Sequence, residues 1–303
     1  MSDDALIVGG SFAGLSAALM LARARRRVLI IDSGMPRNRF ASHSHGVLGL
    51  DGIAGSELLK QARAQLLDYP SVRWISDSVV DVQRNSEGFV ATTASGDTFA
   101  ARKLLLATGV RDELPDLPGL QERWGRSVIH CPYCHGYEVG GGQIGLLGGH
   151  ALSVKMAGVL ADWGQVTLFA HGMTLEQDER ALLQRRGVRI ETERVIGLDG
   201  PAPELSGALL ADGRRIALRA LFVTARQHMG SPLVERLGCE LEESPVGVLV
   251  RVDAQKQTSV PGVYAAGDAT VIGNITLANA EGVRAGVSLH HALIDEDAAR
   301  LPT

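Results

Sequence analysis

The sequence predicts a three-layer α/β protein that contains two doubly wound domains. The chain has 303 residues, which favours two domains, and 45% of them are hydrophobic, which is enough for a sizeable core. The deciding observation is a repeated order of elements: strand, glycine turn, helix and strand follow one another near residue 5 and again near residue 143. This order is typical of Rossmann-like nucleotide-binding domains, so we expect two of them.

Composition and charge exclude several functional classes. The formal net charge is −4, so the chain lacks the basic character of a general nucleic-acid-binding protein. No apolar run reaches the roughly 18 residues of a membrane span, and the opening Met-Ser-Asp-Asp lacks the basic start of a signal peptide. We therefore expect a cytoplasmic protein that binds neither nucleic acid nor membranes.

The first domain begins with a short apolar strand over residues 5–8. A glycine-rich turn at residues 9–14 leads into a helix, because apolar residues recur at helical spacing over 15–24. Three arginines at 25–27 close that helix, where positive charge suits the helix dipole. Residues 28–31 read as a buried strand that ends at an aspartate, which completes a βαβ half-unit.

The glycine turn carries most of a dinucleotide-binding fingerprint. Gly9 and Gly14 occupy the outer positions of G-x-G-x-x-G, whereas Ser11 replaces the middle glycine. Asp32 follows at the end of the next strand, where a carboxylate can accept hydrogen bonds from a ribose. The alternative is an ordinary strand–turn–helix with a surface aspartate, but the combined context favours the nucleotide site.

The rest of the chain contains further elements of the same kinds. Those before the second domain are hairpin strands at 90–93 and 98–101, a strand at 104–109 that ends in Ala107-Thr108-Gly109, and a glycine hinge at 140–142. Those of the second domain are a strand at 144–147, the turn Gly148-Gly149, a helix at 152–163, strands at 166–169 and 221–224, and a hairpin around Asp212-Gly213.

The stretch Cys131-Pro132-Tyr133-Cys134-His135-Gly136-Tyr137-Glu138 is the most informative part of the sequence. Two thiols at this spacing can close a disulfide, and a first thiol at a helix N-terminus is acidified into the attacking thiolate. Half of a zinc site is the alternative, but zinc needs two further ligands at close spacing, and Cys239 stands alone. We expect no metal, and we expect Cys239 to be a small buried residue.

His135 directly follows the second thiol of the pair. A histidine exchanges protons near neutral pH, as thiol–disulfide chemistry requires. Most histidines are structural, but the position beside a redox pair favours a catalytic role for this one.

The segment Val263-Tyr264-Ala265-Ala266-Gly267-Asp268 is an apolar strand that ends in Gly-Asp before a helix. Together with the opening glycine turn, Ala-Thr-Gly at 107–109 and the central C-x-x-C, it makes the chain resemble the low-molecular-weight thioredoxin reductases over nearly its whole length. The resemblance implies a homodimeric flavoprotein. Its FAD-binding domain would be discontinuous, with residues 1–113 and 244–303, and residues 114–243 would form the second Rossmann-like domain that carries the cysteines.

The same resemblance implies which residues hold FAD. The aspartate of the Gly-Asp segment would bind ribityl or phosphate groups, and the C-terminal helix would point its N-terminus at the flavin ring. The expected FAD contacts are Gly9, Gly10, Ser11, Ala13, Gly14, Asp32, Arg37, Asn38, His45, Val80, Ala107, Thr108, Gly109, Gly267, Asp268, Asn274 and Ile275.

Three departures from the thioredoxin reductases indicate that the second domain has lost NADPH. His150 stands at the second fingerprint glycine, where its side chain would crowd a pyrophosphate. Residues 170–174 contain no lysine or arginine to pair a 2′-phosphate. Ala225-Arg226 replaces the glycine expected after the strand at 221–224. A divergent but working NADPH site is the alternative.

One branch of these proteins offers a closer likeness. The C-P-Y-C-H-G-Y-E stretch and residues 35–49 resemble the dithiol oxidases that close disulfides in natural products such as gliotoxin, holomycin and romidepsin. The resemblance implies a small-molecule dithiol that attacks Cys131, a Cys134 that passes the electrons to FAD, and O2 that is reduced to H2O2. It also implies that His135 moves protons and that His45 lies near the flavin and the substrate. A structural role of His45 in the flavin loop is the alternative.

Three other functions remain open at this point. The chain could be an NADPH-dependent reductase of a thioredoxin-like protein, or a reductase that takes electrons from a protein donor such as ferredoxin. It could also be a flavin-binding redox sensor. The histidine after the cysteine pair argues against a sensor, which needs thiols but no neighbouring base.

Overall fold

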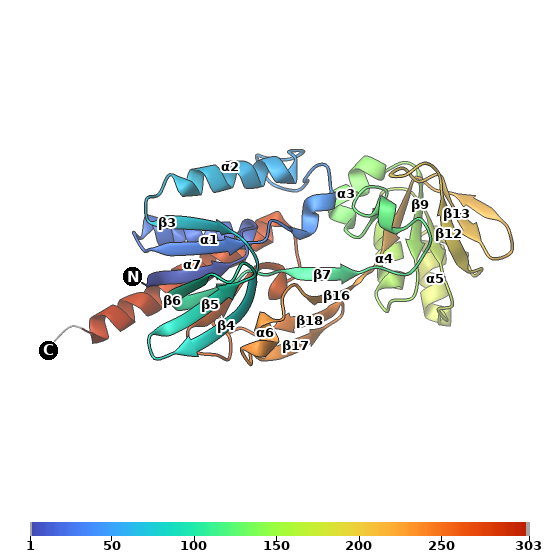
Figure 1. Ribbon diagram of the computed structural model, residues 1–303. Helices are drawn as coiled ribbons and strands as arrows, with labels where there is room; N and C mark the ends of the chain where they lie inside the picture. The colour runs from blue at the N-terminus through green and yellow to red at the C-terminus, as the bar shows by residue number, and fades with distance from the viewer. Residues whose placement is uncertain (1, 301–303) are drawn as a thin grey trace. The chain divides into compact units, whose positions relative to one another are not determined.

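The computed structural model describes residues 2–300, which divide into two compact units (Figure 1). The first unit comprises Met1–Arg39, Gly55–Arg111 and Gln227–Thr303, and the second comprises Phe40–Ala54 and Asp112–Arg226. The expected domain limits, 1–113 with 244–303 and 114–243, differ from this division. Residues 227–243 pack with the first unit, and the loop 40–54 packs with the second.

The first unit is built on a seven-stranded sheet. Its strands are β1 (Asp3–Val8), β2 (Val28–Asp32), β3 (Val72–Ser76), β4 (Val79–Asn85), β5 (Gly88–Thr93), β6 (Thr98–Leu106) and β19 (Val263–Ala265). Its helices are α1 (Phe12–Arg23), α2 (Gly55–Leu67), α6 (Leu233–Arg236) and α7 (Ile275–Ala299), with 3₁₀ turns η1 (Arg37–Phe40) and η3 (Gly267–Ala269). The strand order is β3-β2-β1-β6-β5-β4, and β19 also pairs with β6. Five strands are parallel, whereas the β4–β5 hairpin joins β6 antiparallel.

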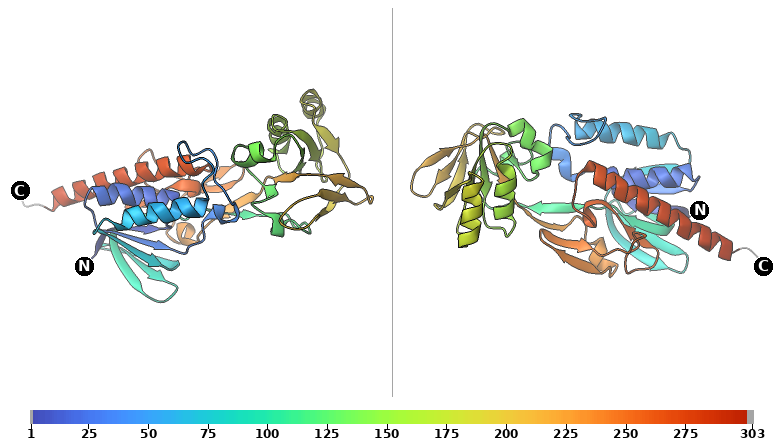
Figure 2. Two further views of the ribbon diagram at one scale, coloured as in Figure 1. Left: turned by 90° about the horizontal axis from the view of Figure 1, so that it is seen from above. Right: turned by 180° about the vertical axis from the view of Figure 1, so that it is seen from behind.

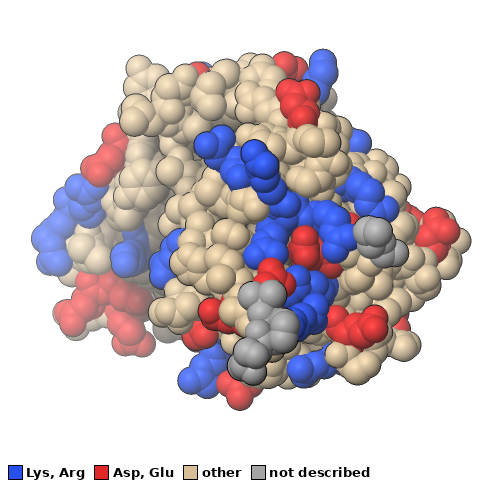
Figure 3. All heavy atoms as spheres, turned by 90° about the vertical axis from the view of Figure 1, so that its left-hand side faces the viewer, with Lys and Arg blue, Asp and Glu red and all other residues tan. Residues whose placement is uncertain are grey.

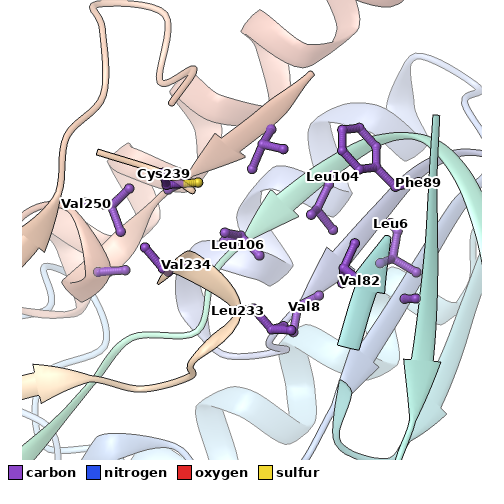
Figure 4. Packing of buried hydrophobic residues seen from close by; sticks show 14 of the residues in the cluster. Leu6, Val8, Val82, Phe89, Leu104, Leu106, Leu233, Val234, Cys239 and Val250 are labelled. Carbon is purple, nitrogen blue, oxygen red and sulfur yellow. The ribbon is translucent and has the colours of Figure 1, made fainter. Parts of the chain in front are cut away.

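The alternation of side chains along β1 explains the layers of this unit. Ala5 and Ile7 face a core shared with α1, α2 and α7, which cover that side of the sheet (Figure 2). Leu6 and Val8 face the opposite core, which includes residues from β4, β5, α6 and β18 (Figure 4). Cys239 lies in this second core, so its prediction as a small buried residue is confirmed. The predicted three-layer α/β class is also confirmed.

Glycines allow α1 and α7 to approach closely. A Cβ atom at Gly282 would lie 2.1 Å from the carbonyl oxygen of Ala13, and one at Gly286 would lie 2.6 Å from that of Ala17. Only glycine fits these two positions without moving a backbone, so they fix the packing of the C-terminal helix on the nucleotide-type half-unit.

Ion pairs tie the end of α7 to the sheet. Arg102 on β6 lies 3.2 Å from Asp4, 2.9 Å from Glu296 and 2.7 Å from Asp297, and Lys103 also pairs with Glu296. Basic and acidic side chains are intermixed on this face of the molecule (Figure 3). Its charges therefore compensate one another and do not form a single-sign patch.

The second unit contains a five-stranded parallel sheet with the order β11-β10-β9-β15-β8. The strands are β8 (Val128–Ile129), β9 (Gln143–Leu147), β10 (Gln165–Phe169), β11 (Arg189–Glu191) and β15 (Ala220–Val223). The helices are α3 (Pro132–Val139), α4 (Ser153–Leu160) and α5 (Gln177–Arg185), with the 3₁₀ turn η2 (Gln121–Arg123). Helices α4 and α5 pack on one face of the parallel sheet. An antiparallel sheet of β12 (Val195–Asp199), β13 (Gly207–Leu210) and β14 (Arg215–Ala217) packs on the other face.

Four further strands form a separate sheet with the order β17-β18-β16-β7. They are β7 (Val110–Glu113), β16 (Arg226–Met229), β17 (Leu241–Ser244) and β18 (Gly247–Val250). None of the helices described between residues 2 and 300 combines the length and apolar character needed to cross a membrane.

The predicted elements agree with the structure except at helix ends and in one strand. The strands expected at 98–101 and 104–109 are a single strand, β6, which ends at Leu106. Both predicted hairpins form, as β5–β6 and β13–β14. The first helix starts at Phe12 rather than 15, because Ser11 already takes the extended N-cap conformation. The helix expected over 152–163 is shorter, Ser153–Leu160, because the chain from Ala161 on forms a turn instead.

Candidate active site

The redox pair lies at the N-terminus of α3. Cys131 is the N-cap residue with an extended backbone, and Pro132 opens the helix, where a missing N–H costs nothing. Cys131 and Cys134 form a disulfide with their Cα atoms 5.3 Å apart. The helix N-terminus favours the thiolate form of Cys131 after reduction, which suits thiol–disulfide exchange.

Trp163 supports this helix from beneath. A Cβ atom at Gly136 would lie 2.8 Å from the indole ring of Trp163, so the glycine after C-x-x-C-H is required by packing. The same indole meets the ring of Tyr133 edge to face at 5.5 Å. The tryptophan therefore packs against two residues of α3 that lie next to the cysteine pair. The sequence alone did not mark it as part of the site.

His135 lies one helical turn after Cys131, on the same side of α3. Its Nδ1 atom is buried and has no hydrogen-bond partner among the described residues. Burial lowers the pKa of His135 below 6.5, against the opposing effects of the Cys131 backbone and the Glu138 carboxylate. The ring is therefore neutral at pH 7, as a proton acceptor must be.

A pocket of about 280 Å³ adjoins the face of α3 that carries His135 and Glu138. It lies entirely within the second unit and combines three histidines, two glutamates and one arginine with small and apolar groups. Its lining consists of Ser42, His43, His45, Gly125, Arg126, Ser127, His135, Glu138, Val139, Pro203 and Glu204.

His45 reaches this pocket from the loop 40–54. Its Nε2 lies 3.5 Å from Oε1 of Glu138, and its Nδ1 lies 3.4 Å from Oδ2 of Asp51. Sequence analysis placed His45 among the FAD contacts, whereas its contacts in the structure are with residues of the second unit. A role of His45 toward FAD stays a prediction.

The fingerprint glycines of the first unit form a tight turn at the carboxyl end of β1. Gly9 has a φ of +105°, and a Cβ atom there would lie 2.3 Å from the carbonyl oxygen of Ala107. A Cβ atom at Gly14 would lie 1.9 Å from the carbonyl oxygen of Gly9. The side chain of Ser11 makes no cap hydrogen bond, so the N-terminus of α1 keeps backbone N–H groups for a phosphate.

Asp32 lies beside this turn at the end of β2. Its Oδ1 accepts a hydrogen bond of 2.9 Å from the backbone N–H of Gly10. The backbone carbonyl oxygen of Asp32 accepts a second hydrogen bond, from the backbone N–H of Asp77. Asp77 lies in the turn before β4, the strand that carries Val80. The carboxylate is thereby held where the ribose of a dinucleotide would be expected.

The remaining predicted FAD contacts gather at the ends of β6 and β19. Arg37 pairs with Asp268 at 2.9 Å, which joins η1, where Asn38 also lies, to η3. The Thr108 hydroxyl is buried without a hydrogen-bond partner among the described residues. Asn274 caps α7 by accepting a hydrogen bond of 3.0 Å from the N–H of Leu277. These residues, with a glycine turn and an acidic side chain, fit a flavin dinucleotide.

The second unit has a cavity of about 510 Å³ at the ends of β9 and β10, where its own dinucleotide would be expected. Its lining consists of Gly149, His150, Ala151, Val154, His171, Gly172, Met173, Thr174 and Glu179 and contains no lysine or arginine. Nδ1 of His150 accepts the N–H of Leu152 at 3.1 Å, so this side chain occupies the turn before α4. Burial lowers the pKa of His171, and Arg194 lowers it further, so that ring is neutral. The lining therefore offers no lysine or arginine to pair with a 2′-phosphate.

These features can be compared with known proteins. The family model of the pyridine nucleotide-disulphide oxidoreductases matches residues 3–282. The chain belongs to this family. It is a flavin-dependent thiol–disulfide oxidoreductase, and the disulfide on α3 agrees with this activity.

Relatives of this oxidoreductase extend over nearly its whole length. Thioredoxin reductase tcpT of Claviceps purpurea is 36% identical over 88% of this chain and 86% of its own. The crystal structure of an oxidoreductase from Agrobacterium tumefaciens has a TM-score of 0.93 and 43% identity, covering 97% of this chain and 99% of that one. The crystal structure of HlmI also has a TM-score of 0.93, with 39% identity over 98% of this chain and 94% of that one.

The structure adds residues that sequence analysis did not assign to the site. They are Ser42, His43, Arg126, Trp163 and Glu204, together with Glu138 as the partner of His45. Glu138 carried a usable signal, because it follows His135 by three positions and so shares a helix face with it. Ser42 and His43 lie in the stretch 35–49 that resembles the dithiol oxidases, whereas nothing local in the sequence marks Arg126, Trp163 or Glu204.

Proposed function

We propose that this oxidoreductase is a dithiol oxidase, which closes a disulfide in a small-molecule dithiol and uses O2 as the final electron acceptor. Cys131 and Cys134 are the redox pair, FAD is the cofactor, and H2O2 is the second product. NADPH takes no part in this reaction.

The observation that carries the proposal is the lining of the cavity at β9 and β10. A reductase of this family takes electrons from NADPH at that place, and binding of the 2′-phosphate requires positive charge. Here the lining offers Glu179, two histidines and no lysine or arginine. The electrons must then come from another donor, and the disulfide of the cysteine pair is the group that can accept them from a dithiol.

The size of the pocket beside α3 favours a small substrate. A volume of about 280 Å³ lies near the lower end of small-molecule sites, whereas a protein partner needs a broad surface. The lining carries three histidines and two glutamates, which exchange protons, as a substrate that must lose two thiol protons requires.

The reaction proceeds by two exchanges of sulfur bonds. A substrate thiol loses its proton to His135, and its sulfur attacks Sγ of Cys131, which releases Cys134 as a thiolate. The second substrate thiol then loses its proton, and its sulfur attacks the substrate sulfur of the mixed disulfide, which releases Cys131 as a thiolate. Two electrons have passed from the substrate to the enzyme sulfurs. Bound FAD supplies the transfer of these two electrons to O2, which leaves with two protons as H2O2.

An aerobic assay with dithiothreitol tests this function. We expect one O2 to be consumed and one H2O2 formed for each disulfide closed, without NADPH, as followed with an oxygen electrode and a peroxide assay. The proposal fails if dithiothreitol causes no oxygen uptake while NADPH drives reduction of a protein disulfide. That result would return the chain to the thioredoxin-type reductases.

A further inference from the structure

The first unit contains a buried ion pair to which the reaction described above gives no role. Lys256, from the loop that precedes β19, pairs with Glu281 on the second turn of α7, and each side chain is only 8% exposed. Charges buried to this degree are costly unless they are paired and hydrogen-bonded. We therefore asked what else the two side chains hold in place.

The backbone at Lys256 indicates that its side chain matters. Its φ is +65°, in the left-handed region that favours glycine or asparagine. Its N–H donates a hydrogen bond of 3.1 Å to the carbonyl oxygen of Asp253, and its carbonyl oxygen accepts one of 3.0 Å from the N–H of Ala265. This conformation gives no reason for a lysine here, whereas the ion pair with Glu281 does.

Glu281 also reaches the turn η3, through Thr270. The buried hydroxyl of Thr270 lies 3.0 Å from Oε2 of Glu281 and 3.1 Å from the carbonyl oxygen of Gly267, the first residue of η3. The carboxylate is the stronger acceptor for its single proton. The same carbonyl oxygen accepts the backbone N–H groups of Thr270 and Val271 at 2.8 and 3.0 Å. Thr270 therefore closes η3, and Glu281 holds it to α7.

The turn η3 lies where three elements expected to hold FAD meet. A Cβ atom at Gly267 would lie 2.9 Å from the Cβ atom of Ala13 on α1, and one at Gly282, next to Glu281, would lie 2.1 Å from the carbonyl oxygen of Ala13. Asp268 on η3 accepts the N–H of Gly273, just before α7 begins, at 3.4 Å. The start of α1, η3 and the start of α7 are thus joined around the bond between Glu281 and Thr270.

We propose that Glu281 is a positioning residue for FAD. Lys256 compensates its charge, and its carboxylate holds Thr270 and thereby fixes Asp268 relative to α1 and α7. FAD then meets a cradle that is already formed, and loss of the bond between Glu281 and Thr270 weakens its binding. The inference rests on FAD as the cofactor of the proposed function, and it is independent of whether the enzyme oxidises dithiols or reduces disulfides.

Dilution of the FAD-loaded enzyme tests this role. Free FAD is separated by ultrafiltration and measured at each protein concentration, which gives the dissociation constant, and thermal unfolding is followed in parallel. We expect Thr270→Val to raise the dissociation constant at least about tenfold, as loss of a hydrogen bond to a charged acceptor does. Thr270→Ser keeps the hydroxyl and should stay within about threefold of the wild type.

Thr258→Val is the matched control. Thr258 is also buried, and its hydroxyl accepts the N–H of Val260 at 3.1 Å, but it lies outside η3. The control therefore loses a buried hydroxyl of the same kind, and it should bind FAD as the wild type does even if its unfolding temperature falls.

Two double variants separate the hydrogen bond from the ion pair. Lys256→Met with Glu281→Gln removes both charges but keeps an oxygen that accepts the Thr270 proton, so it should bind FAD within about threefold of the wild type. Lys256→Met with Glu281→Met also removes the acceptor and should bind FAD about tenfold more weakly. Adding Thr270→Val to this second variant should cause no further loss, because the bond is already gone.

Several results would overturn the assignment. They are wild-type FAD affinity in Thr270→Val, an equal loss of affinity in Thr258→Val, and failure of Thr270→Ser to keep the affinity. Equal FAD affinity of the two double variants would also overturn it, since the pair would then act on stability alone. If Thr270→Val does not fold, the comparison of the double variants decides. Oxygen uptake by the wild type with dithiothreitol tests the proposed function separately.

Discussion

Cys134→Ser is expected to abolish the bleaching of the flavin absorption band by dithiothreitol in the absence of oxygen, while the protein keeps its FAD. The serine hydroxyl cannot form a disulfide with Cys131, so the enzyme has no bond that can accept the two electrons of the substrate. FAD should stay bound, because the residues that fit it lie in the first unit and Cys134 lies in the second. Anaerobic stopped-flow absorbance measures the loss, and the flavin content of the purified protein measures cofactor binding.

Cys239→Ser is the matched control for this experiment. Cys239 is buried in a core of the first unit and forms no disulfide, so the variant should be bleached at the wild-type rate. Bleaching of Cys134→Ser at the wild-type rate would contradict the account, because electrons would then reach the flavin without the cysteine pair.

His135→Gln is expected to slow the anaerobic reduction by dithiothreitol about 100-fold at pH 7, the lower part of the usual range for loss of a general base. Burial lowers the pKa of His135 below 6.5, so the wild-type ring is neutral and able to accept a proton at this pH. The loss should shrink as the pH rises past about 8.5, because the substrate thiol then ionises by itself. The measurement is the rate of flavin bleaching at pH values from about 6 to about 9.5, in steps of about half a pH unit.

A structural role for His135 would give a different profile. Misplacement of α3 would slow the reaction by the same factor at every pH, because it would not depend on ionisation of the substrate. A bleaching rate of His135→Gln that is reduced by the same factor at every pH would therefore contradict the proton-accepting role of His135. A rate that is unchanged at pH 7 would contradict any role of His135 in the exchange.

Much of the fold could be predicted because its signals are local. The apolar runs of β1 and β2 and the glycine turn between them lie within one short stretch, and their order alone indicates a βαβ half-unit. The placement of residues 40–54 could not be predicted in the same way. Their association with the second unit depends on contacts with elements far along the chain, such as that between Phe40 and Gly125.

The residues of the candidate site also fall into two groups, those marked by local sequence and those brought together only by the fold. The cysteines and His135 are adjacent in sequence, and Pro132 marks the start of their helix, so the pair and its base could be predicted directly. The contact between His45 and Glu138 joins residues from a loop and a helix that no periodicity relates. The cation-free lining at β9 and β10 was predicted in part from His150 and residues 170–174, because those positions follow the strands of a known nucleotide-binding pattern.

The most direct test of the central claim is an anaerobic comparison of two electron donors. NADPH is added to one sample of the yellow protein and dithiothreitol to another, and the visible flavin band is followed in both. We expect bleaching by dithiothreitol but not by NADPH, with H2O2 formed when air is admitted to the reduced sample. Rapid bleaching by NADPH would overturn the proposed oxidase function, because the cavity lined by His150 and Glu179 would then bind the nucleotide and the enzyme would work as a reductase.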